Sequence, residues 1–263
     1  MTAVITVMEP PDIFIPTKNS ESTLRPCLES VIREFPESKI YIIDDSDSEG
    51  CLHIAEAYGV LAVNGGGMNV GSARDLAIKY ASTEYMIFVD SDVTLERGFG
   101  RIAGVEMKLG ADFVNSYVMF GDTNNPTLMT VSEWTRKHGM GVNSFAGAII
   151  RTELARQFRI PHMSAGEDGA FVKVLRRNGY SVRTSLGLIV SHPMTDREAL
   201  KAYKWYGYSA GKYISVEKGV VRALKVARLG FRVGRVETVI LQIRLSTAWI
   251  HGFIIRKLEI HFP

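Results

Sequence analysis

An apolar run that ends in two carboxylates constrains the possible folds of this sequence most. Residues 86–89 read Met-Ile-Phe-Val, and Asp90, Ser91 and Asp92 follow without a break. A run that is apolar on both faces is typical of a buried strand in a parallel sheet. In open α/β sheets, the carboxyl ends of such strands form the edge where ligands bind. The run therefore predicts an α/β fold with two carboxylates at that edge.

These two carboxylates have two interpretations. Asp90 and Asp92 would repel each other unless a cation lies beside them, and hard carboxylate oxygens suit Mg²⁺ or Mn²⁺. This interpretation predicts a site for a metal ion and a diphosphate. Alternatively, the segment is an ordinary turn, because Asp and Ser end many strands by hydrogen bonding to their own backbone. An Asp-X-Asp pair alone does not decide between the two.

The first half of the chain alternates between short apolar runs and segments with helical spacing. The apolar runs span residues 13–15, 40–43 and 60–63, and the helical segments span residues 24–35, 54–58 and 71–81. This alternation predicts a mostly parallel, Rossmann-like sheet with helices on both faces. The ends of the first, second and fourth strands would then meet at one edge. The side chains expected there are Thr17, Asn19, Asp45, Asp90 and Asp92.

The second half has a less regular pattern. We expect strands at residues 112–119, 145–150, 181–184 and 188–190, and helices at residues 131–137 and 166–177. Gly147 and Ala148 are small enough to let a ligand approach the backbone. Asp168 lies at the start of an expected helix, where an acidic residue is also an ordinary cap. His192 follows the last expected strand, either as a ligand or as a plain loop residue.

The ordered motifs of this chain resemble those of glycosyltransferase family 2. A strand ending in Pro-Thr-X-Asn is followed by a strand ending in Asp-Asp-Ser, then by Gly-X-Ala-Arg, Asp-X-Asp and Glu-Asp. The resemblance covers roughly residues 12–195 and implies a GT-A-like fold that binds a nucleotide-sugar donor. At Asp75 the sequence departs from the family, which usually has Asn there.

The resemblance also implies roles for individual residues. Those implied to bind the donor are Pro16, Thr17, Asn19, Asp45, Gly71, Arg74, Asp90, Ser91 and Gly147. Those implied to hold Mn²⁺ or Mg²⁺ are Asp90, Asp92 and His192. Asp168 is implied to be the general base. The chemistry is consistent with these roles, because sugar transfer needs a neutralised leaving diphosphate and a base near the acceptor hydroxyl.

The basic residues are concentrated at the carboxyl end. Residues 197–263 contain thirteen Lys or Arg and four Asp or Glu, whereas residues 1–196 contain eighteen and twenty-four. We therefore expect a catalytic domain at residues 1–196 and a basic helical extension at residues 197–263. Apolar residues recur at helical spacing over residues 236–254, with Trp249 and Phe253 near the apolar side. A basic amphipathic helix suits an anionic membrane surface.

Two alternatives for the extension remain open, since its helices could also pack on the catalytic domain or form a homodimer interface. The longest uncharged run, residues 245–255, is shorter than the roughly 20 residues that span a bilayer. We expect no nucleic-acid partner, because no recognised motif accompanies the charge.

Cysteine content and the first residues indicate a cytoplasmic location. Cys27 and Cys51 are the only cysteines and are expected to be reduced thiols. Residues 1–11 include Glu9, Pro10 and Pro11, which are not typical of a signal peptide. We therefore expect a cytoplasmic protein or one bound to the cytoplasmic face of a membrane.

Together these features predict a metal-dependent, inverting hexosyltransferase of polysaccharide or glycolipid synthesis. The donor is expected to be a UDP-sugar, with a GDP-sugar as the alternative, and the acceptor a hydroxyl on a sugar or a lipid-linked molecule. A polyprenyl-phosphate glycosyl synthase, in which a phosphate attacks, is the first rival. A non-catalytic nucleotide-binding domain is the second. A sugar nucleotidyltransferase is disfavoured, because residues 16–20 lack the glycine-rich loop of such enzymes.

Overall fold

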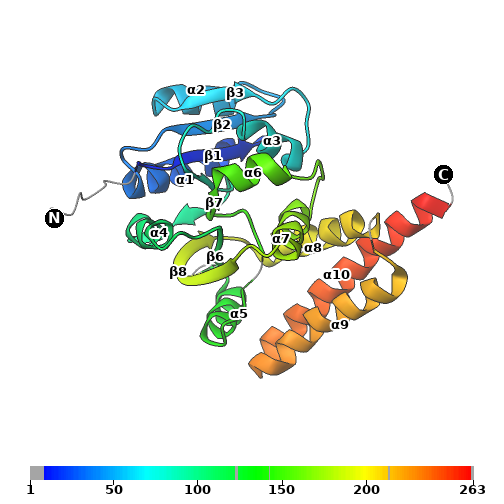
Figure 1. The fold of residues 1–263 in the computed structure, drawn as a ribbon. Helices are drawn as coiled ribbons and strands as arrows, with labels where there is room; N and C mark the ends of the chain where they lie inside the picture. The colour runs from blue at the N-terminus through cyan, green and yellow to red at the C-terminus, as the bar shows by residue number, and fades with distance from the viewer. Residues whose placement is uncertain (1–8, 122–123, 142, 213, 262–263) are drawn as a thin grey trace. The chain divides into compact units, whose positions relative to one another are not determined.

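The computed structural model describes residues 9–121, 124–141, 143–212 and 214–261 (Figure 1). Residues 1–8, within the segment expected to hold no signal peptide, lie outside the described residues. The chain forms two compact units. The first contains residues 1–117, 142–162 and 167–190, and the second contains residues 118–141, 163–166 and 191–263. The expected domain boundary after residue 196 stays a prediction, since the second unit also includes an earlier segment.

An eight-stranded sheet with the order β3-β2-β1-β4-β7-β6-β8-β5 organises the first unit. Its strands are β1 (Asp12–Thr17), β2 (Ile40–Asp44), β3 (Leu61–Asn64), β4 (Tyr85–Phe88), β5 (Thr94–Leu95), β6 (Phe113–Phe120), β7 (Ala148–Arg151) and β8 (Val182–His192). Strands β3, β2, β1 and β4 are parallel, whereas β7 is antiparallel to both β4 and β6. The expected α/β sheet is confirmed, and its antiparallel part comes from the less regular second half.

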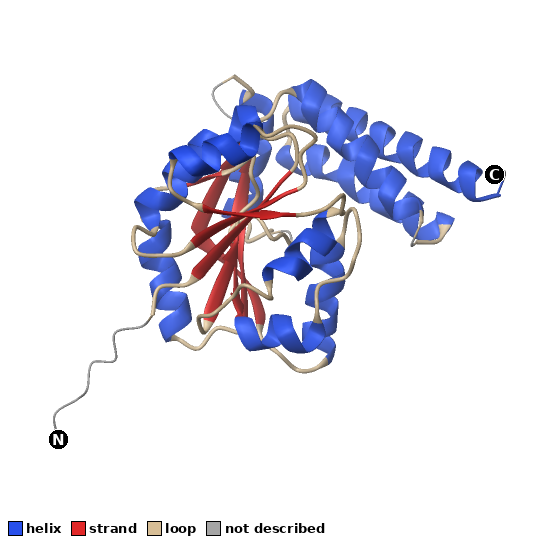
Figure 2. Cartoon of the chain, turned by 90° about the horizontal axis from the view of Figure 1, so that it is seen from above, coloured by secondary structure: helices blue, strands red, loops and turns tan. Residues whose placement is uncertain are grey.

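Helices cover both faces of this sheet (Figure 2). They are α1 (Glu21–Glu34), α2 (Gly50–Ala57), α3 (Val70–Ala77), α4 (Phe99–Lys108), α6 (Thr152–Phe158) and α7 (Glu167–Arg177). Helix α3 begins where the Asn69 side chain accepts a hydrogen bond from Ser72 N at 3.0 Å, as a capping residue does. The aromatic core under α3, α6 and α7 includes Phe14, Phe88, Phe113, Phe145 and Phe171.

The second unit consists mainly of four helices. They are α5 (Pro126–Lys137), α8 (Asp196–Gly211), α9 (Val216–Val233) and α10 (Val236–His261). A capping box starts α8, in which Thr195 and Glu198 satisfy each other's backbone N–H groups. Helix α10 contacts the other three helices. A Cβ atom on Gly207 of α8 would lie 1.9 Å from Trp249 O, so the backbones of α8 and α10 meet directly.

Trp249 and Phe253, expected near the apolar side of a helix on a membrane surface, are core residues of this unit. Trp249 and Phe253 are 2% and 4% exposed and stack on each other at 5.2 Å. They pack with Ala223 of α9, because the small side chains of α8 and α9 leave room for the rings.

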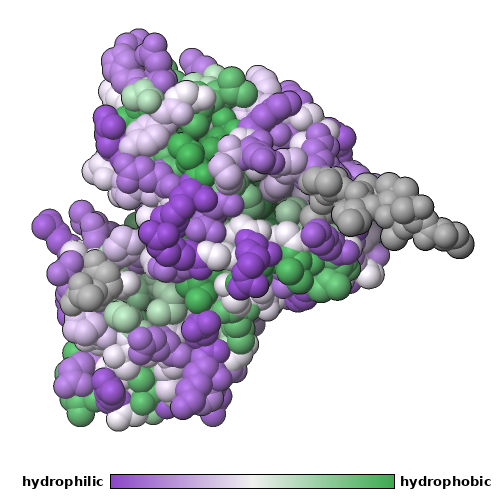
Figure 3. All heavy atoms as spheres, turned by 90° about the vertical axis from the view of Figure 1, so that its left-hand side faces the viewer, coloured by the Kyte–Doolittle hydropathy of each residue, from purple (hydrophilic) through white to green (hydrophobic). Residues whose placement is uncertain are grey.

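Helix α10 has a mixed character. By length and composition its residues 236–259 could cross a membrane, yet 44% of the tested window is buried, a pattern that core helices of soluble proteins share. On the face of the molecule drawn in Figure 3, hydrophilic side chains separate several apolar patches.

Candidate active site

The segments that follow β1 and β2 are bound to each other at the carboxyl edge of the sheet. The parallel register places Thr17 beside Asp44, and Thr17 Oγ1 donates to Asp44 Oδ1 at 2.6 Å. Asn19 has a left-handed backbone with φ of 52°. Its Nδ2 donates to Asp47 Oδ2 at 2.8 Å, and its Oδ1 accepts from Asp47 N at 2.9 Å. Thr17, the last residue of β1 after Pro16, is thus held by the last residue of β2. Asn19 is held by the loop that follows β2.

Asp45 is the next predicted donor-binding residue, and it fixes the glycine-rich turn. Its Oδ1 accepts hydrogen bonds from Gly67 N at 2.5 Å and Met68 N at 2.8 Å, and its Oδ2 accepts from Lys18 Nζ at 2.8 Å. Burial by itself would raise the pKa of Asp45, but these three donors hold it below its ordinary value. Asp45 thus anchors the backbone of the glycine-rich turn, residues 65–67, at Gly67 and at the following Met68.

Arg74 links two predicted parts of the site. Its side chain is 5% exposed and donates to both Asp90 Oδ1 and Glu167 Oε1. The guanidinium carbon lies 4.9 Å from the centre of the Phe145 ring. Burial would lower the pKa of Arg74, but the charges of Asp90 and Glu167 raise it above its ordinary value. Arg74 is therefore a permanent buried cation between the end of β4 and the start of α7.

Glu167 is a functional candidate that the sequence analysis missed. It is 5% exposed, and burial raises its pKa to about 7, although Arg74 acts in the opposite direction. The neighbouring carboxylate of Asp168 adds to the rise. The Glu-Asp pair was considered only for its second residue, and the available signal for Glu167 was its place at the start of an amphipathic helix.

Asp90, Ser91 and Asp92 follow β4 after Val89 at this edge. Val93 N donates to Asp90 O at 3.3 Å, so the backbone forms the turn of the simpler interpretation. Ser91 Oγ donates to Ser20 Oγ at 2.9 Å, and the side chain of Asp92 is exposed. Burial and then the negative charges of Asp92 and Asp90 raise the pKa of the Cys27 thiol, which donates to Asp90 O at 3.4 Å.

The carboxylate oxygens of Asp90 and Asp92 fit a hard divalent ion. Within the described ranges, however, no group of three or more His, Cys, Asp or Glu side chains is arranged to hold a metal. A metal ion here would take its remaining ligands from water or a diphosphate, as Mg²⁺ commonly does. His192 is the last residue of β8 and belongs to the second unit, so its part in metal binding stays a prediction.

The remaining predicted residues lie on separate elements. Gly71 is buried in the first turn of α3, and Asp168 is the second residue of α7, where its Oδ1 accepts from Gly169 N at 2.5 Å. Gly147 precedes β7 with φ of 72°, and a Cβ atom there would lie 2.8 Å from Val190 Cγ1. Core packing and backbone conformation therefore explain this glycine, and a place beside the donor sugar stays a prediction.

Asp75, the residue that departs from the family pattern, is paired with Arg159 and hydrogen bonded to His162. It is 5% exposed and accepts from Arg159 Nε at 2.7 Å, Ile160 N at 3.2 Å and a ring nitrogen of His162 at 3.0 Å. Burial would raise the pKa of Asp75, but Arg159 and His162 hold it below its ordinary value. Asp75 thereby fixes the chain after α6.

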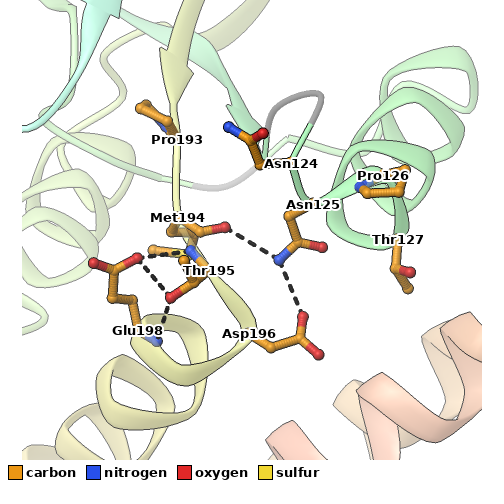
Figure 4. Close-up of a pocket in the computed structure, with 9 residues that line it drawn as sticks. All are labelled: Asn124, Asn125, Pro126, Thr127, Pro193, Met194, Thr195, Asp196 and Glu198. Atoms are coloured by element: carbon orange, nitrogen blue, oxygen red, sulfur yellow. Dashed lines mark hydrogen bonds between the residues drawn. The ribbon is translucent and has the colours of Figure 1, made fainter.

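The second unit contains a cavity of about 440 Å³ between the loop before α5 and the start of α8 (Figure 4). Asn125 points across it and donates from Nδ2 to Met194 O at 3.1 Å and to Asp196 Oδ1 at 3.0 Å. Thr195 and Glu198 are occupied by the capping box. The polar groups of this cavity therefore serve to join α5 to α8, and we assign it no ligand.

Comparison with known proteins gives one family match. Residues 12–157 match the model described as Glycosyl transferase family 2. Poly(ribitol-phosphate) beta-N-acetylglucosaminyltransferase TarS of Staphylococcus aureus is 34% identical over 91 residues, covering 30% of this chain and 16% of that protein. Poly(ribitol-phosphate) beta-glucosyltransferase of Bacillus spizizenii is 37% identical over 92 residues, covering 30% of this chain and 14% of that protein. The match thus spans only a small part of either relative.

Solved structures resemble the whole chain more broadly. Residues 1–349 of S. aureus TarS with UDP-GlcNAc give a TM-score of 0.55 at 13% identity, covering 96% of this chain and 92% of that chain. The mannosyltransferase PcManGT from Pyrobaculum calidifontis with GDP-Man and Mn²⁺ gives 0.63 at 14% identity, covering 95% and 73%. At such identities the likeness establishes the fold, and the expected GT-A-like fold is confirmed.

Proposed function

The chain belongs to glycosyl transferase family 2, and we propose that it transfers a sugar from a nucleotide-activated donor to a hydroxyl group with inversion. The observation that carries this proposal is the buried Arg74, which binds Asp90 after β4 and Glu167 at the start of α7. Arg74 and Glu167 are 93 residues apart in the sequence. The contacts of Arg74 bring the Asp-X-Asp and Glu-Asp segments to one edge of the parallel part of the sheet, where open α/β folds bind ligands.

In the proposed reaction, the nucleotide lies against the loops after β1 and β2. Thr17, Asn19 and Asp45 are held there by hydrogen bonds to neighbouring residues, so the surface that they form is preorganised. Asp90 and Asp92 would hold Mn²⁺ or Mg²⁺, with His192 as a further ligand. Such an ion would neutralise the charge that develops on the leaving diphosphate.

Asp168 is proposed to act as the general base. Its carboxylate accepts the proton of the acceptor hydroxyl while the new bond from that oxygen to the anomeric carbon forms. The bond from the anomeric carbon to the donor's phosphate oxygen breaks on the opposite face, and the nucleoside diphosphate leaves. Arg74 and Glu167 keep this part of α7 in place, because Glu167 is buried beside the guanidinium and precedes the base by one residue.

The donor and acceptor are the finer parts of the proposal. Related curated proteins are named for transfer of N-acetylglucosamine or glucose to poly(ribitol-phosphate), and a polyol phosphate chain offers free hydroxyl groups. We therefore propose a UDP-hexose or UDP-N-acetylhexosamine as donor, GDP-mannose as the alternative, and a polyol phosphate or lipid-linked acceptor reached at the cytoplasmic face of a membrane.

Thermal shift against UDP-glucose, UDP-GlcNAc and GDP-mannose with Mn²⁺ would identify the donor, because a ligand bound only to the folded state raises Tm. Asp168→Asn should then retain the donor's Tm shift but lower kcat about 10²- to 10⁴-fold, the usual contribution of a general base. Glu153→Gln, at a side chain 73% exposed on α6, is the matched control and should keep kcat.

Two results would contradict the proposal. Full activity of Asp168→Asn on a polyprenyl phosphate would favour the rival in which a phosphate attacks without a base. A donor-induced Tm shift without any release of nucleoside diphosphate, whichever acceptor is supplied, would indicate a binding domain instead of an enzyme.

A further inference from the structure

Helices α9 and α10 carry a strip of large apolar side chains that the rest of the described chain leaves exposed. Six of them are between 45% and 64% exposed. They are Val220, Leu224 and Phe231 on α9, and Ile240, Ile243 and Ile254 on α10. Large contiguous apolar patches are uncommon on soluble monomers and usually mark a binding surface. This set is called the α9–α10 face below.

The contacts between the helices show that the two rows form one face. The pairs Gly219–Phe253, Ala223–Ser246 and Gly230–Thr238 join α9 to α10, so the helices run antiparallel. A helix turns by about 100° per residue, so Leu224 and Phe231 lie roughly a quarter turn around α9 from this line of contact with α10. Ile243 and Ile254 of α10 lie on the same side of the line of contact as Leu224 and Phe231. Helix α8 packs on the opposite side of α10.

Basic residues border the face along α9. Residues 216–235 contain six Lys or Arg and a single acidic residue, Glu217. Arg228 and Arg232 are exposed on the outer side of α9 next to Phe231, and Arg235 is exposed in the link between α9 and α10. Among the described residues, none of the salt bridges involves these three arginines. An apolar strip with an unneutralised cationic border is complementary to the headgroups and acyl boundary of an anionic bilayer.

We propose that the α9–α10 face binds an anionic lipid bilayer, with both helices lying parallel to its surface. A second copy of this chain on the same face would bring two arginine rows together without acidic partners, which disfavours a dimer. Insertion of α10 across the bilayer would separate it from α8. The backbones of these two helices are in close contact, since a Cβ atom on Gly252 would lie only 1.8 Å from Lys204 O, and this contact disfavours insertion. The inference deepens the membrane part of the proposed function, and it can be tested separately from sugar transfer because it uses no residue of the candidate active site.

The test is co-sedimentation of the full chain with phosphatidylcholine vesicles that contain or lack phosphatidylglycerol. We expect binding to the anionic vesicles, much weaker binding to the neutral ones, and loss of binding as salt screens the charges. Arg228→Gln/Arg232→Gln should weaken binding about thirtyfold, since each cation near such a surface contributes roughly a factor of five. Leu224→Gln/Ile243→Gln should weaken it at least about tenfold through lost apolar burial.

Matched controls use exposed residues of the first unit. Leu61→Gln/Leu109→Gln replaces side chains that are 51% and 71% exposed, and Arg101→Gln/Lys108→Gln removes two exposed cations of α4. Both should bind vesicles like the wild type. Equal binding by the face variants and controls, or no wild-type preference for anionic vesicles, would overturn the proposal.

Sedimentation velocity tests whether a second copy of this chain, instead of a bilayer, covers the α9–α10 face. A wild-type dimer that Leu224→Gln/Ile243→Gln converts to a monomer would also overturn the proposal, because it would assign the face to a second copy. The Tm shift with donor and Mn²⁺ is measured on every variant. Its absence in the wild type would count against the proposed function alone, and its presence in a face variant shows that the variant is folded.

Discussion

Replacing Arg74 by Met would test how the candidate site is held together. Arg74→Met keeps an unbranched apolar stem against Phe145 but removes the guanidinium that binds Glu167 and Asp90. Asp90 is 32% exposed, so water can replace its lost partner, whereas the Glu167 side chain is 6% exposed. Removal of one partner from a buried ion pair costs about 3–5 kcal/mol, because a buried charge remains uncompensated.

This cost should depend on pH. In the wild type the pKa of Glu167 is raised from 4.5 to about 7, so the folded state holds a proton that the unfolded state releases. Stability from this group is complete below about pH 4.5 and falls by about 1.4 kcal/mol per pH unit until pH 7. Without Arg74 the pKa rises further, so the fall continues above pH 7 in the variant and stops in the wild type.

Urea unfolding at pH 5.5 and pH 8 measures this difference. We expect Arg74→Met to lose about 1–2 kcal/mol at pH 5.5, the value of its neutral-partner hydrogen bonds, and about 3–5 kcal/mol at pH 8. Arg74→Met/Glu167→Gln should recover most of the loss at pH 8, because no buried charge remains.

The control is Arg183→Met, which breaks the ion pair between Arg183 and Glu106. Because the Arg183 side chain is 41% exposed, this substitution should lower the free energy of unfolding by at most about 1 kcal/mol at either pH. Equal losses by Arg74→Met at both pH values, or a double variant no more stable than the single one at pH 8, would refute the reasoning.

Three further substitutions have defined outcomes. Asp75→Asn should lower the free energy of unfolding by about 1.5–3 kcal/mol at pH 7, since it removes a charged acceptor. The pKa of Asp75 is lowered in the folded state, so this loss should vanish as the pH falls below that pKa. Urea titrations at several pH values measure the change. Gly252→Ala should lower Tm markedly, because its Cβ would lie 1.8 Å from Lys204 O on α8, while Gly169→Ala, with nothing within 4 Å of the added Cβ, should not. Gly147→Ala should cost about 1–3 kcal/mol by overpacking, measured by denaturant unfolding, because its Cβ would lie 2.8 Å from Val190 Cγ1.

The sequence was most informative where local pattern and burial coincide. The runs at residues 13–15, 40–43 and 86–89 are buried strands because each is apolar on both faces. Helix α4 (Phe99–Lys108) was missed, although Phe99, Ala103 and Met107 recur every four residues. Gly98, Gly100 and Gly104 weaken the helical propensity of that segment, and only packing against the sheet stabilises the helix.

The candidate site was predictable only in part, because its polar contacts join distant segments. The motifs indicated Asp90 and Asp168 individually, but the Arg74–Glu167 pair spans 93 residues, and no local pattern reports such a contact. The two expected strands at residues 181–184 and 188–190 form the single strand β8 (Val182–His192). The local pattern did not report this either, because the explanation is a contact with a distant segment. Gly187 interrupts the pattern but provides the space that Ile102 needs, as its Cβ would lie 3.1 Å from Ile102 Cδ1.

The charges at the edge of the sheet fall into two groups with different consequences. Glu167 and Asp90 share the buried Arg74 and are neutralised within the protein. Asp92 is exposed, and its charge still acts on the Cys27 thiol. Arg74 therefore offsets the repulsion between Glu167 and Asp90, while the side chain of Asp92 is exposed to solvent. In the proposed function, a divalent ion that arrives with a diphosphate would meet carboxylates that the protein already orders, and it would take its remaining ligands from the diphosphate and water.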